Sequence, residues 1–130
     1  MNASGGSAVI GIGVDAVDVA RFRDTLSRTP SLRERVFTAG ELVPLSTRVD
    51  PVPSLAARFA AREAVMKAMG VGLGAFDFHD VWVDSLESGR PVLQVSGRAE
   101  ALAEERGIGS WHLSLTHTDD VAIAYVVASV

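Results

Sequence analysis

The strongest constraint on the fold is an alanine-dense segment over residues 55–69, near the middle of the chain. Alanine has the highest helix propensity, and Gly70 follows the segment at a position where helices commonly end. We therefore predict a helix over 55–69 that Ser54 opens. Its apolar side chains form one stripe, which predicts a face turned to the core or to an interface. The members of this stripe are Leu55, Phe59, Met66 and Met69.

Apolar runs and turn residues predict the remaining elements. Before the central helix we predict a buried strand over 8–17, a helix capped by Asp18, a short turn with a capping box of Ser31 and Glu34, a helix over 41–45 capped by Thr38, and a loop over 46–54. After it we predict a glycine-rich loop over 70–76, a hairpin of strands 81–86 and 92–95, a helix over 97–106, and a hairpin of strands 111–116 and 121–127. Early helices and late hairpins predict an α+β fold, with a small antiparallel sheet of hairpins packed on a long central helix.

Length and composition indicate a single domain. The chain has 130 residues, of which 48% are hydrophobic, and this is enough for one core. We expect the domain to span residues 9–130, after a flexible segment over residues 1–8. An apolar excess in a chain this short favours burial of some surface against another subunit, so we expect an oligomer.

Cysteine and charge content exclude several function classes. Cysteine is absent, which excludes disulfides, thiolate metal sites and cysteine nucleophiles and agrees with a cytoplasmic location. No apolar run is long enough to span a bilayer, so we predict no membrane role. The net charge of −4 argues against a general nucleic-acid binder. The arginines from Arg21 to Arg35 form either a basic face for an acidic partner or an ordinary solvated helix face.

Charged side chains at two places are candidates for chemistry. Asp15 interrupts an apolar run, where a carboxylate costs free energy unless it is paired or binds a cation, although such a residue is more often a cap or an ion-pair partner. Glu63 and Lys67 lie four residues apart, hence on one helix face, and in isolation they form an ordinary ion pair more often than a site. Arg58 and Arg62 add positive charge to this helix, which then suits the approach of an anion.

His117 and the glycine-rich loop carry weaker signals. His117 lies at the inner end of a predicted strand, where a histidine is more often structural, yet among hydroxyl side chains it can donate to a phosphate oxygen. The glycines from Gly70 to Gly74 match neither a Walker loop nor a dinucleotide loop, and a glycine after a helix is commonly a C-cap. These residues by themselves leave the function open.

Three blocks of sequence, in this order and at fitting distances, carry a more specific signal. They are Gly11-Ile-Gly-Val-Asp-Ala-Val-Asp-Val-Ala-Arg-Phe; Phe37-Thr-Ala-Gly-Glu with Leu55-Ala-Ala-Arg-Phe-Ala-Ala-Arg-Glu-Ala-Val-Met-Lys-Ala-Met-Gly; and Leu113-Ser-Leu-Thr-His-Thr with Ala122-Ile-Ala-Tyr-Val-Val-Ala. Together they resemble the holo-acyl-carrier-protein synthase family, and the resemblance extends from Ile10 to Ala128. Gly89-Arg-Pro-Val-Leu-Gln-Val-Ser-Gly-Arg-Ala is similar to the middle hairpin of that family and the helix after it.

The resemblance implies a 4'-phosphopantetheinyl transferase fold and the corresponding reaction. The serine hydroxyl of an apo acyl carrier protein, as used in fatty acid biosynthesis, would attack the phosphorus that bears the pantetheine of coenzyme A, and 3',5'-ADP would leave. It also implies a homotrimer with sites at subunit interfaces. Two alternatives remain: a metal-dependent nucleotide hydrolase that uses the same acids with water as the nucleophile, and a non-catalytic module that binds nucleotide or carrier protein.

The resemblance also implies a role for each candidate residue. Asp15 and Glu63 would hold Mg²⁺, and either Glu63 or a metal-bound water would take the serine proton. The implied coenzyme A contacts are Arg58, Arg62, Lys67, Gly72 and His117, and Arg21 would meet the carrier protein. Two residues depart from the common pattern, because Arg62 stands in place of a lysine and Thr116 in place of a serine.

Overall fold

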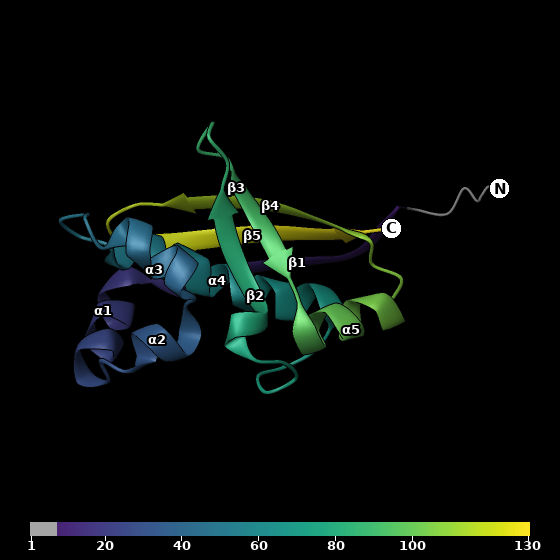
Figure 1. Ribbon diagram of the computed structural model, residues 1–130, viewed down its shortest axis with the longest axis horizontal. Coiled ribbons are helices and arrows are strands. Elements are labelled where there is room, and N and C mark those ends of the chain that lie inside the picture. The colour runs from purple at the N-terminus through teal and green to yellow at the C-terminus, as the bar shows by residue number, and fades with distance from the viewer. Residues whose placement is uncertain (1–7) are drawn as a thin grey trace.

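The structure, a computed structural model that describes residues 8–130, is built around helix α4 (Val52–Met69), which lies near the centre of Figure 1. Gly70 ends the helix in the left-handed conformation with φ of 71°, as the sequence predicts. The predicted start at Ser54 is wrong, because the helix begins at Val52 and the loop before it is shorter. Prolines suit a first turn, where the missing N–H has no helical partner, so Pro51 and Pro53 flank the start without breaking it.

Three antiparallel strands form the larger sheet, in the order β1–β5–β4. Their bounds are β1 Val9–Asp18, β4 Ser110–His117 and β5 Val121–Ser129. The β4–β5 hairpin confirms the prediction. The sequence pattern did not predict that β5 also pairs along β1, with Asp15 opposite Ala124. This pairing brings the two ends of the described chain together, and the N–H of Val130 donates to the carbonyl of Ala8 at 2.8 Å.

A second, two-stranded sheet and a helix complete the C-terminal half. Strands β2 (Val81–Ser85) and β3 (Pro91–Val95) form the predicted hairpin, which crosses β4 and β5 at a steep angle in the view of Figure 1. Helix α5 (Gly97–Glu105) follows as predicted. The short 3-10 helix η1 (Phe78–Asp80) was not predicted.

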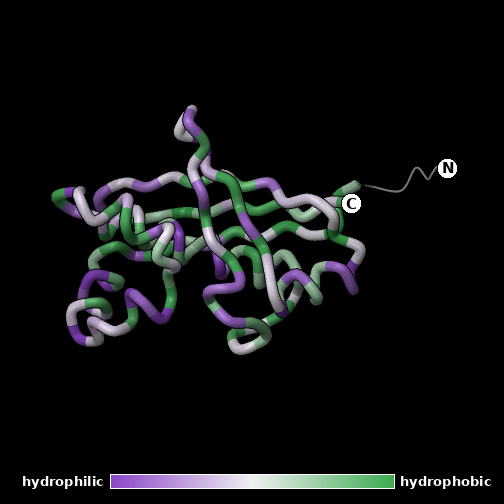
Figure 2. The backbone as a smooth tube through the Cα atoms, in the orientation of Figure 1, coloured by the Kyte–Doolittle hydropathy of each residue, from purple (hydrophilic) through white to green (hydrophobic). Residues whose placement is uncertain are grey.

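Three short helices lie between β1 and α4. They are α1 (Val19–Arg28), α2 (Leu32–Val36) and α3 (Ala39–Leu45). Asp18 caps α1 by accepting from the N–H of Arg21 at 2.9 Å, and Thr38 with Glu41 forms a capping box for α3. The predicted capping box of Ser31 and Glu34 is wrong, since Ser31 has helical dihedrals and makes no side-chain cap. Hydrophilic residues gather on α1 and α2 in Figure 2.

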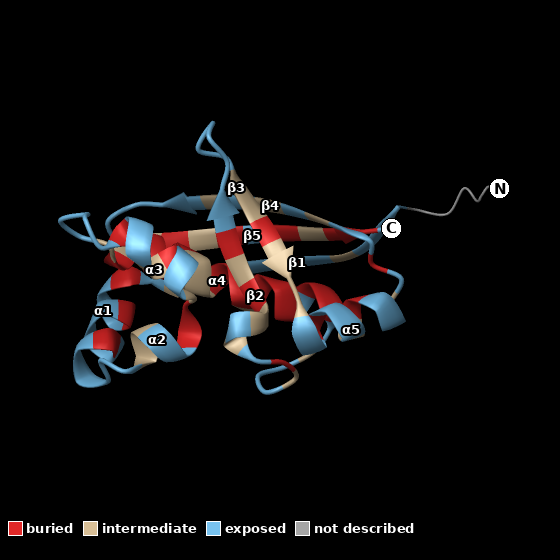
Figure 3. Cartoon of the chain, in the orientation of Figure 1, coloured by how far each residue is buried: buried red, intermediate tan, exposed pale blue. Residues whose placement is uncertain are grey.

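Strand β1 packs closely on α4 because two of its residues are glycines. A Cβ on Gly11 would overlap the carbonyl oxygen of Ala68, and one on Gly13 would overlap that of Ala64. Small residues on both elements therefore let the strand backbone touch the helix. Two hydrophobic clusters contain successive parts of α4, one its N-terminal part and the other the rest of the helix. Val17, Phe78 and Leu115 pack against both clusters. Figure 3 shows that much of α4 is buried.

The opposite face of the sheet is apolar and uncovered in the single chain. Because Gly11 and Gly13 face α4, their neighbours along β1 face away from it. Ile12 is 54% exposed, and Val14 is 49% exposed opposite Tyr125, which is 46% exposed. β1 appears largely exposed in Figure 3. A contiguous apolar face of this kind usually marks an interaction surface.

The single domain over residues 9–130 stays a prediction. The predicted flexible segment over residues 1–8 lies, apart from Ala8, outside the described residues. Within residues 8–130, no helix has the length and apolar character needed to cross a membrane.

Candidate active site

Asp15 of β1 and Lys67 of α4 meet where the strand crosses the helix. The Lys67 ammonium donates to Asp15 Oδ1 and to the carbonyl oxygen of Val14, both at 3.0 Å. The Asp15 side chain is 18% exposed and that of Lys67 is 56% exposed. The carboxylate that interrupts the apolar run therefore has a cationic partner, as its partial burial requires.

Glu63 shares this region but has no such partner. In the described part of the chain its carboxylate accepts no hydrogen bond and forms no ion pair, so the ordinary Glu63–Lys67 ion pair does not form. Burial raises the pKa of Glu63, the negative charge of Asp15 raises it further, and Lys67 opposes the rise. The carboxylates of Asp15 and Glu63 thus lie close enough to interact, and Lys67 interacts with both.

Both carboxylates line a cavity of about 440 Å³ between β1, α1 and α4. Arg21 lines the same cavity, so the structure brings the predicted metal pair and the predicted carrier-binding arginine together. The wall beside them is apolar and consists of Val17, Phe22, Leu32 and Phe59.

The donor set fits Mg²⁺. Asp15, Glu63 and Lys67 leave one negative charge uncompensated, and burial, followed by the charge of Asp15, raises the pKa of Glu63. Among residues 8–130 no three His, Cys, Asp or Glu side chains converge on one point. Mg²⁺ is commonly held by one or two carboxylates and completes its shell with water and substrate phosphate, so two acids are sufficient.

A second cavity, of about 240 Å³, lies on another side of α4 and is lined by Arg48, Arg58 and His117. Arg58 NH1 donates to the Ser54 carbonyl at 3.2 Å, while Arg58 Nε is buried and, among the residues described, has no partner. Burial lowers the pKa of Arg58. The negative charge of Glu41 raises this pKa, and the positive charges of Arg48 and Arg62 lower it further. An anion in this cavity would be attracted by the positive charges of Arg48 and Arg58.

Arg62 lines neither cavity, so its contact with coenzyme A stays a prediction that the geometry of this chain does not favour. Its side chain is fully buried and donates to Glu41 Oε1 at 2.6 Å and Oε2 at 3.1 Å. Its Nε donates to the Phe78 carbonyl at 2.8 Å, and the guanidinium lies 5.2 Å from the centre of the Phe37 ring. The pair therefore joins α3 and η1 to α4 and leaves no donor directed at solvent.

The remaining predicted residues divide between the two cavities or lie outside them. Asp15, Glu63 and Arg21 line one cavity and Arg58 and His117 the other, and the two have no residue in common. Gly72 lines neither, and a Cβ there would meet open space, so packing gives no reason for glycine at this position.

Comparison with known proteins identifies the family. The family model of the 4'-phosphopantetheinyl transferase superfamily matches residues 11–126. The chain belongs to this superfamily. A Micrococcus luteus protein named holo-[acyl-carrier-protein] synthase is 51% identical over 122 residues, which cover 92% of this chain and 91% of the relative.

Solved phosphopantetheinyl transferase structures have the same fold. The holo-[acyl-carrier-protein] synthase of Neisseria meningitidis superposes with a TM-score of 0.84 at 32% identity, over 94% of this chain and 99% of that one. The corresponding synthase of Bacillus anthracis, solved in complex with coenzyme A (3',5'-ADP), superposes with a TM-score of 0.79 at 29% identity, over 95% and 98%. The predicted α+β transferase fold is confirmed.

Sequence reasoning missed Arg48 and the role of Gly11 and Gly13. Arg48 lies in a proline-rich loop, where neither periodicity nor a motif singles it out, and only the fold brings it beside Arg58. The alternation of glycine in Gly11-Ile-Gly is a signal that was available, because glycine inside a strand often marks a close backbone approach.

Proposed function

We propose that this chain transfers the 4'-phosphopantetheine group of coenzyme A to a serine of an apo acyl carrier protein. The observation that carries the proposal is the pairing of two cavities of opposite chemistry on one helix. One presents the carboxylates of Asp15 and Glu63, which suit a divalent cation, and the other presents Arg48, Arg58 and His117, which suit a phosphate. Coenzyme A carries both a diphosphate and a separate 3'-phosphate.

The transfer is an in-line displacement at phosphorus. The carrier serine oxygen bonds to the phosphorus that bears pantetheine, the bond from that phosphorus to 3',5'-ADP breaks, and either Glu63 or a water molecule at the metal site takes the serine proton. Asp15 and Glu63 would hold Mg²⁺, which would supply positive charge against the diphosphate. The Lys67 ammonium fixes Asp15 and would contact phosphate as a point charge. Arg58, Arg48 and His117 anchor the distant phosphate, and Gly72 lies near the nucleotide.

Arg21 meets the carrier protein. It is exposed at the first turn of α1 and lines the cavity of Asp15 and Glu63, so an acidic carrier held there presents its serine to the diphosphate. Arg21→Ala should raise the carrier concentration that gives half-maximal rate and leave that for coenzyme A unchanged. An equal change for both substrates would contradict the docking role.

The active enzyme is a homotrimer whose sites lie between subunits. Arg58 and Glu63 leave α4 about 140° apart, so the two cavities lie on different sides of the helix, and a site between subunits would pair the acid cavity of one copy with the arginine cavity of another. The uncovered apolar face of the sheet, with Ile12, Val14 and Tyr125, supplies the contact surface. A closed trimeric ring repeats one heterologous contact, in which one patch of each copy meets a different patch of the next. The cysteine-free composition agrees with action in the cytoplasm.

Intact-mass analysis of an apo carrier protein tests the function. The carrier is incubated with this protein, coenzyme A and Mg²⁺, beside a chelator control. The expected result is a metal-dependent gain of one phosphopantetheine on the carrier. Release of 3',5'-ADP without any gain by the carrier would instead assign a nucleotide hydrolase, and ligand binding without turnover would assign a binding module.

Mixed oligomers test the shared site. Asp15→Ala and Arg58→Ala should each be inactive alone, because each removes one half of every site. When the two are unfolded and refolded together, some interfaces pair an intact acid cavity with an intact arginine cavity, and activity should return to a fraction of wild type. If native mass spectrometry detects mixed oligomers that stay inactive, the site is not shared between subunits.

A further inference from the structure

One ion pair on the surface joins helix α1 to the loop between α3 and α4, residues 46–51. Arg23 Nη1 donates to Asp50 Oδ1 at 3.0 Å, and Arg23 Nη2 donates to Asp50 Oδ2 at 2.8 Å. Both side chains are about half exposed, at 46% and 45%. A bidentate pair fixes the orientation of the two groups as well as their distance. The loop is therefore tied to α1 in a defined position.

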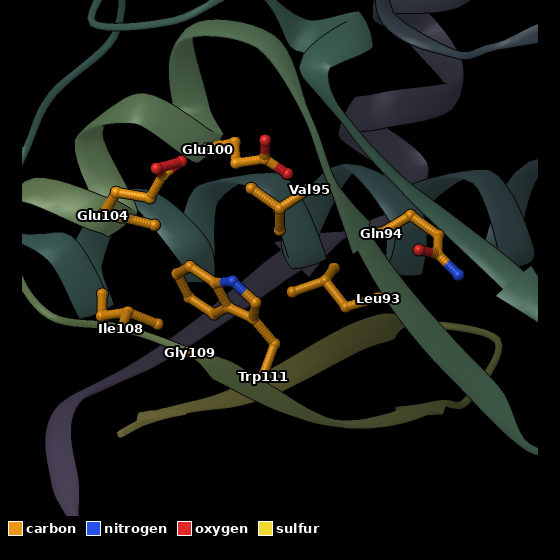
Figure 4. Close-up of a pocket in the computed structure, with 9 residues that line it drawn as sticks. Leu93, Gln94, Val95, Glu100, Glu104, Ile108, Gly109 and Trp111 are labelled. Carbon is orange, nitrogen blue, oxygen red and sulfur yellow. The ribbon is translucent and has the colours of Figure 1, made fainter.

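Two other exposed carboxylates show that the acids of this chain do not pair by default. Glu100 and Glu104 line a cavity of about 430 Å³ beside α5 (Figure 4), and in the described part of the chain neither has an ion pair or a side-chain hydrogen bond. Asp50 differs, because hydrogen bonds from Arg23 and from the Val52 N–H lower its pKa. Its contact with α1 is therefore specific.

The loop has few other restraints. Val49 is fully exposed, so apolar packing does not hold the loop there. The N–H of Arg48 donates to the last residue of α3 at 3.1 Å, and Asp50 Oδ1 accepts from the first residue of α4 at 3.1 Å. Among the described residues, Arg23 is the only hydrogen-bond partner of the loop outside the two helices that it connects.

The same loop carries Arg48 to the cavity that also contains Arg58 and His117. Arg48 Nη1 donates to Ser54 Oγ at 2.6 Å, which directs the guanidinium along α4. The Arg48 side chain is exposed, so its place in the cavity depends on where the loop backbone lies. Asp50 follows only two residues later, and a movement of Asp50 therefore displaces Arg48.

Helix α1 lies between the two halves of the proposed site. Arg21 and Arg23 leave α1 about 200° apart, hence on opposite sides of the helix. Arg21 lines the cavity of Asp15 and Glu63, while Arg23 reaches the loop of Arg48. One helix therefore connects the cavity of the two acids to the loop that completes the cavity of the arginines.

We propose that Arg23 and Asp50 are positioning residues for Arg48, and that their ion pair holds the loop where Arg48 can bind a phosphate. The inference rests on the proposed function, in which Arg48 and Arg58 anchor the phosphate of coenzyme A that is distant from the diphosphate. Neither member of the pair lines the cavity, so neither touches the ligand. Loss of the pair weakens the phosphate contact through Arg48 and leaves the acids of the other cavity in place.

Binding of 3',5'-ADP, measured by isothermal titration calorimetry, tests the pair apart from catalysis. Arg23→Gln and Asp50→Asn should each weaken binding about threefold to fivefold, and asparagine keeps an acceptor for the Val52 N–H. The double variant should weaken binding no further, because either change removes the same pair. The matched control is Arg28→Gln, which removes an exposed arginine of α1 that has no ion pair among the described residues, and it should change binding less than about twofold.

A cycle with Arg48→Ala separates positioning from a general effect of charge or stability. Arg48→Ala alone should weaken binding at least about tenfold, since a charge-assisted hydrogen bond to phosphate is lost. Arg23→Gln should have no further effect in this background, because the pair acts through Arg48. Exposed ion pairs contribute little to stability, so the melting temperatures of Arg23→Gln and Asp50→Asn should stay within about 2 °C of the wild type.

Transfer of phosphopantetheine by the wild type is measured beside binding, so that the two proposals fail separately. A wild type that binds 3',5'-ADP and transfers nothing contradicts the proposed function alone, and the cycle still decides the role of the pair. The inference is overturned if the wild type shows no saturable binding, if Arg23→Gln binds as the wild type does, or if Arg28→Gln weakens binding equally. It is also overturned if Arg23→Gln weakens binding as much in the Arg48→Ala background as alone.

Discussion

Arg62 and Glu63 are neighbours on α4, yet their environments differ completely. They leave the helix about 100° apart, so Arg62 turns into the molecule and Glu63 turns to a cavity. Arg62 is fully buried, and its guanidinium is bound by both oxygens of Glu41 and by the Phe78 carbonyl. Glu63 has no hydrogen-bond or ionic partner within residues 8–130, and burial and Asp15 raise its pKa.

The difference separates charges that hold the fold from charges that await a ligand. A buried ion that is fully bonded costs little while its partner is present, but its loss leaves the other charge without compensation. An unpartnered, half-buried carboxylate that is ionised at neutral pH lowers the stability of the fold. This loss of stability is offset only when a cation binds. Arg58 is the cationic counterpart of Glu63, because its buried Nε also lacks a partner.

The largest expected effect concerns the two carboxylates of the proposed metal site, Asp15 and Glu63. Asp15→Asn and Glu63→Gln should each lower the rate of transfer at least about a thousandfold, since each removes one of two carboxylates that hold the ion. Both variants should fold, because neither residue lies in the buried core. Steady-state rates and circular dichroism check this, with Glu105→Gln as the control. Near-normal activity in both variants would refute the metal assignment.

Substitution of Arg62, which is paired with Glu41, should lower the stability of the fold and leave the transfer reaction unchanged. Arg62→Met leaves Glu41 buried without its cation and should cost about 3–5 kcal/mol of unfolding free energy, measured in urea. The unfolding free energy of Arg62→Lys should lie between those of the wild type and Arg62→Met, since an ammonium cannot bond both carboxylate oxygens and the Phe78 carbonyl together. The KM for coenzyme A of the folded variants should change less than about twofold. A large rise in the KM for coenzyme A at unchanged stability would show that Arg62 contacts coenzyme A.

The sequence predicts most of the fold because its signals are local. The Thr38 N-cap, the Gly70 C-cap and the β4–β5 hairpin each depend on residues close together in the chain, and all are present. The pairing of β1 with β5 joins segments more than 100 residues apart, which no local pattern encodes. The start of α4 was wrong because prolines were interpreted only as breakers, although they are also favoured in a first turn.

The candidate site was predictable only in part. Asp15, Glu63 and Lys67 stood out because charge in apolar or alanine-rich surroundings is costly, and the structure brings them together. Arg62 has the same surroundings in the sequence, yet its partner Glu41 is 21 residues away and reaches it only through the fold. The separation of Arg58 from Glu63 follows from helix geometry, since five residues turn them about 140° apart, and only the walls of the two cavities depend on tertiary structure.

Substitutions at two glycines test whether the position of Asp15 depends on the close contact between the backbones of β1 and α4. Gly13→Ala should cost about 1–3 kcal/mol or more, because the new Cβ overlaps the Ala64 carbonyl and pushes β1 with Asp15 away from α4. Gly72→Ala is the matched control for stability, since its Cβ meets open space, and it should change the unfolding free energy by less than about 1 kcal/mol. Urea unfolding measures both, and equal costs would contradict the close approach. A rise in KM for coenzyme A in Gly72→Ala would support its predicted place near the nucleotide.

The smallest expected effect is a pH dependence of stability from Glu63. Its pKa is higher in the folded chain than the value of about 4.3 in an unfolded chain, so the folded state binds the proton more tightly. Stability from this group is therefore complete below the unfolded value and is lost as the pH rises through the folded value. In metal-free protein Glu63→Gln should melt about 2 °C higher than the wild type at pH 7.5, and the difference should vanish near pH 4. Excess Mg²⁺ should raise the wild-type melting temperature and not that of the variant. A difference that stays constant with pH, or a wild type that is more stable without metal at pH 7.5, would show that Glu63 has a structural partner after all.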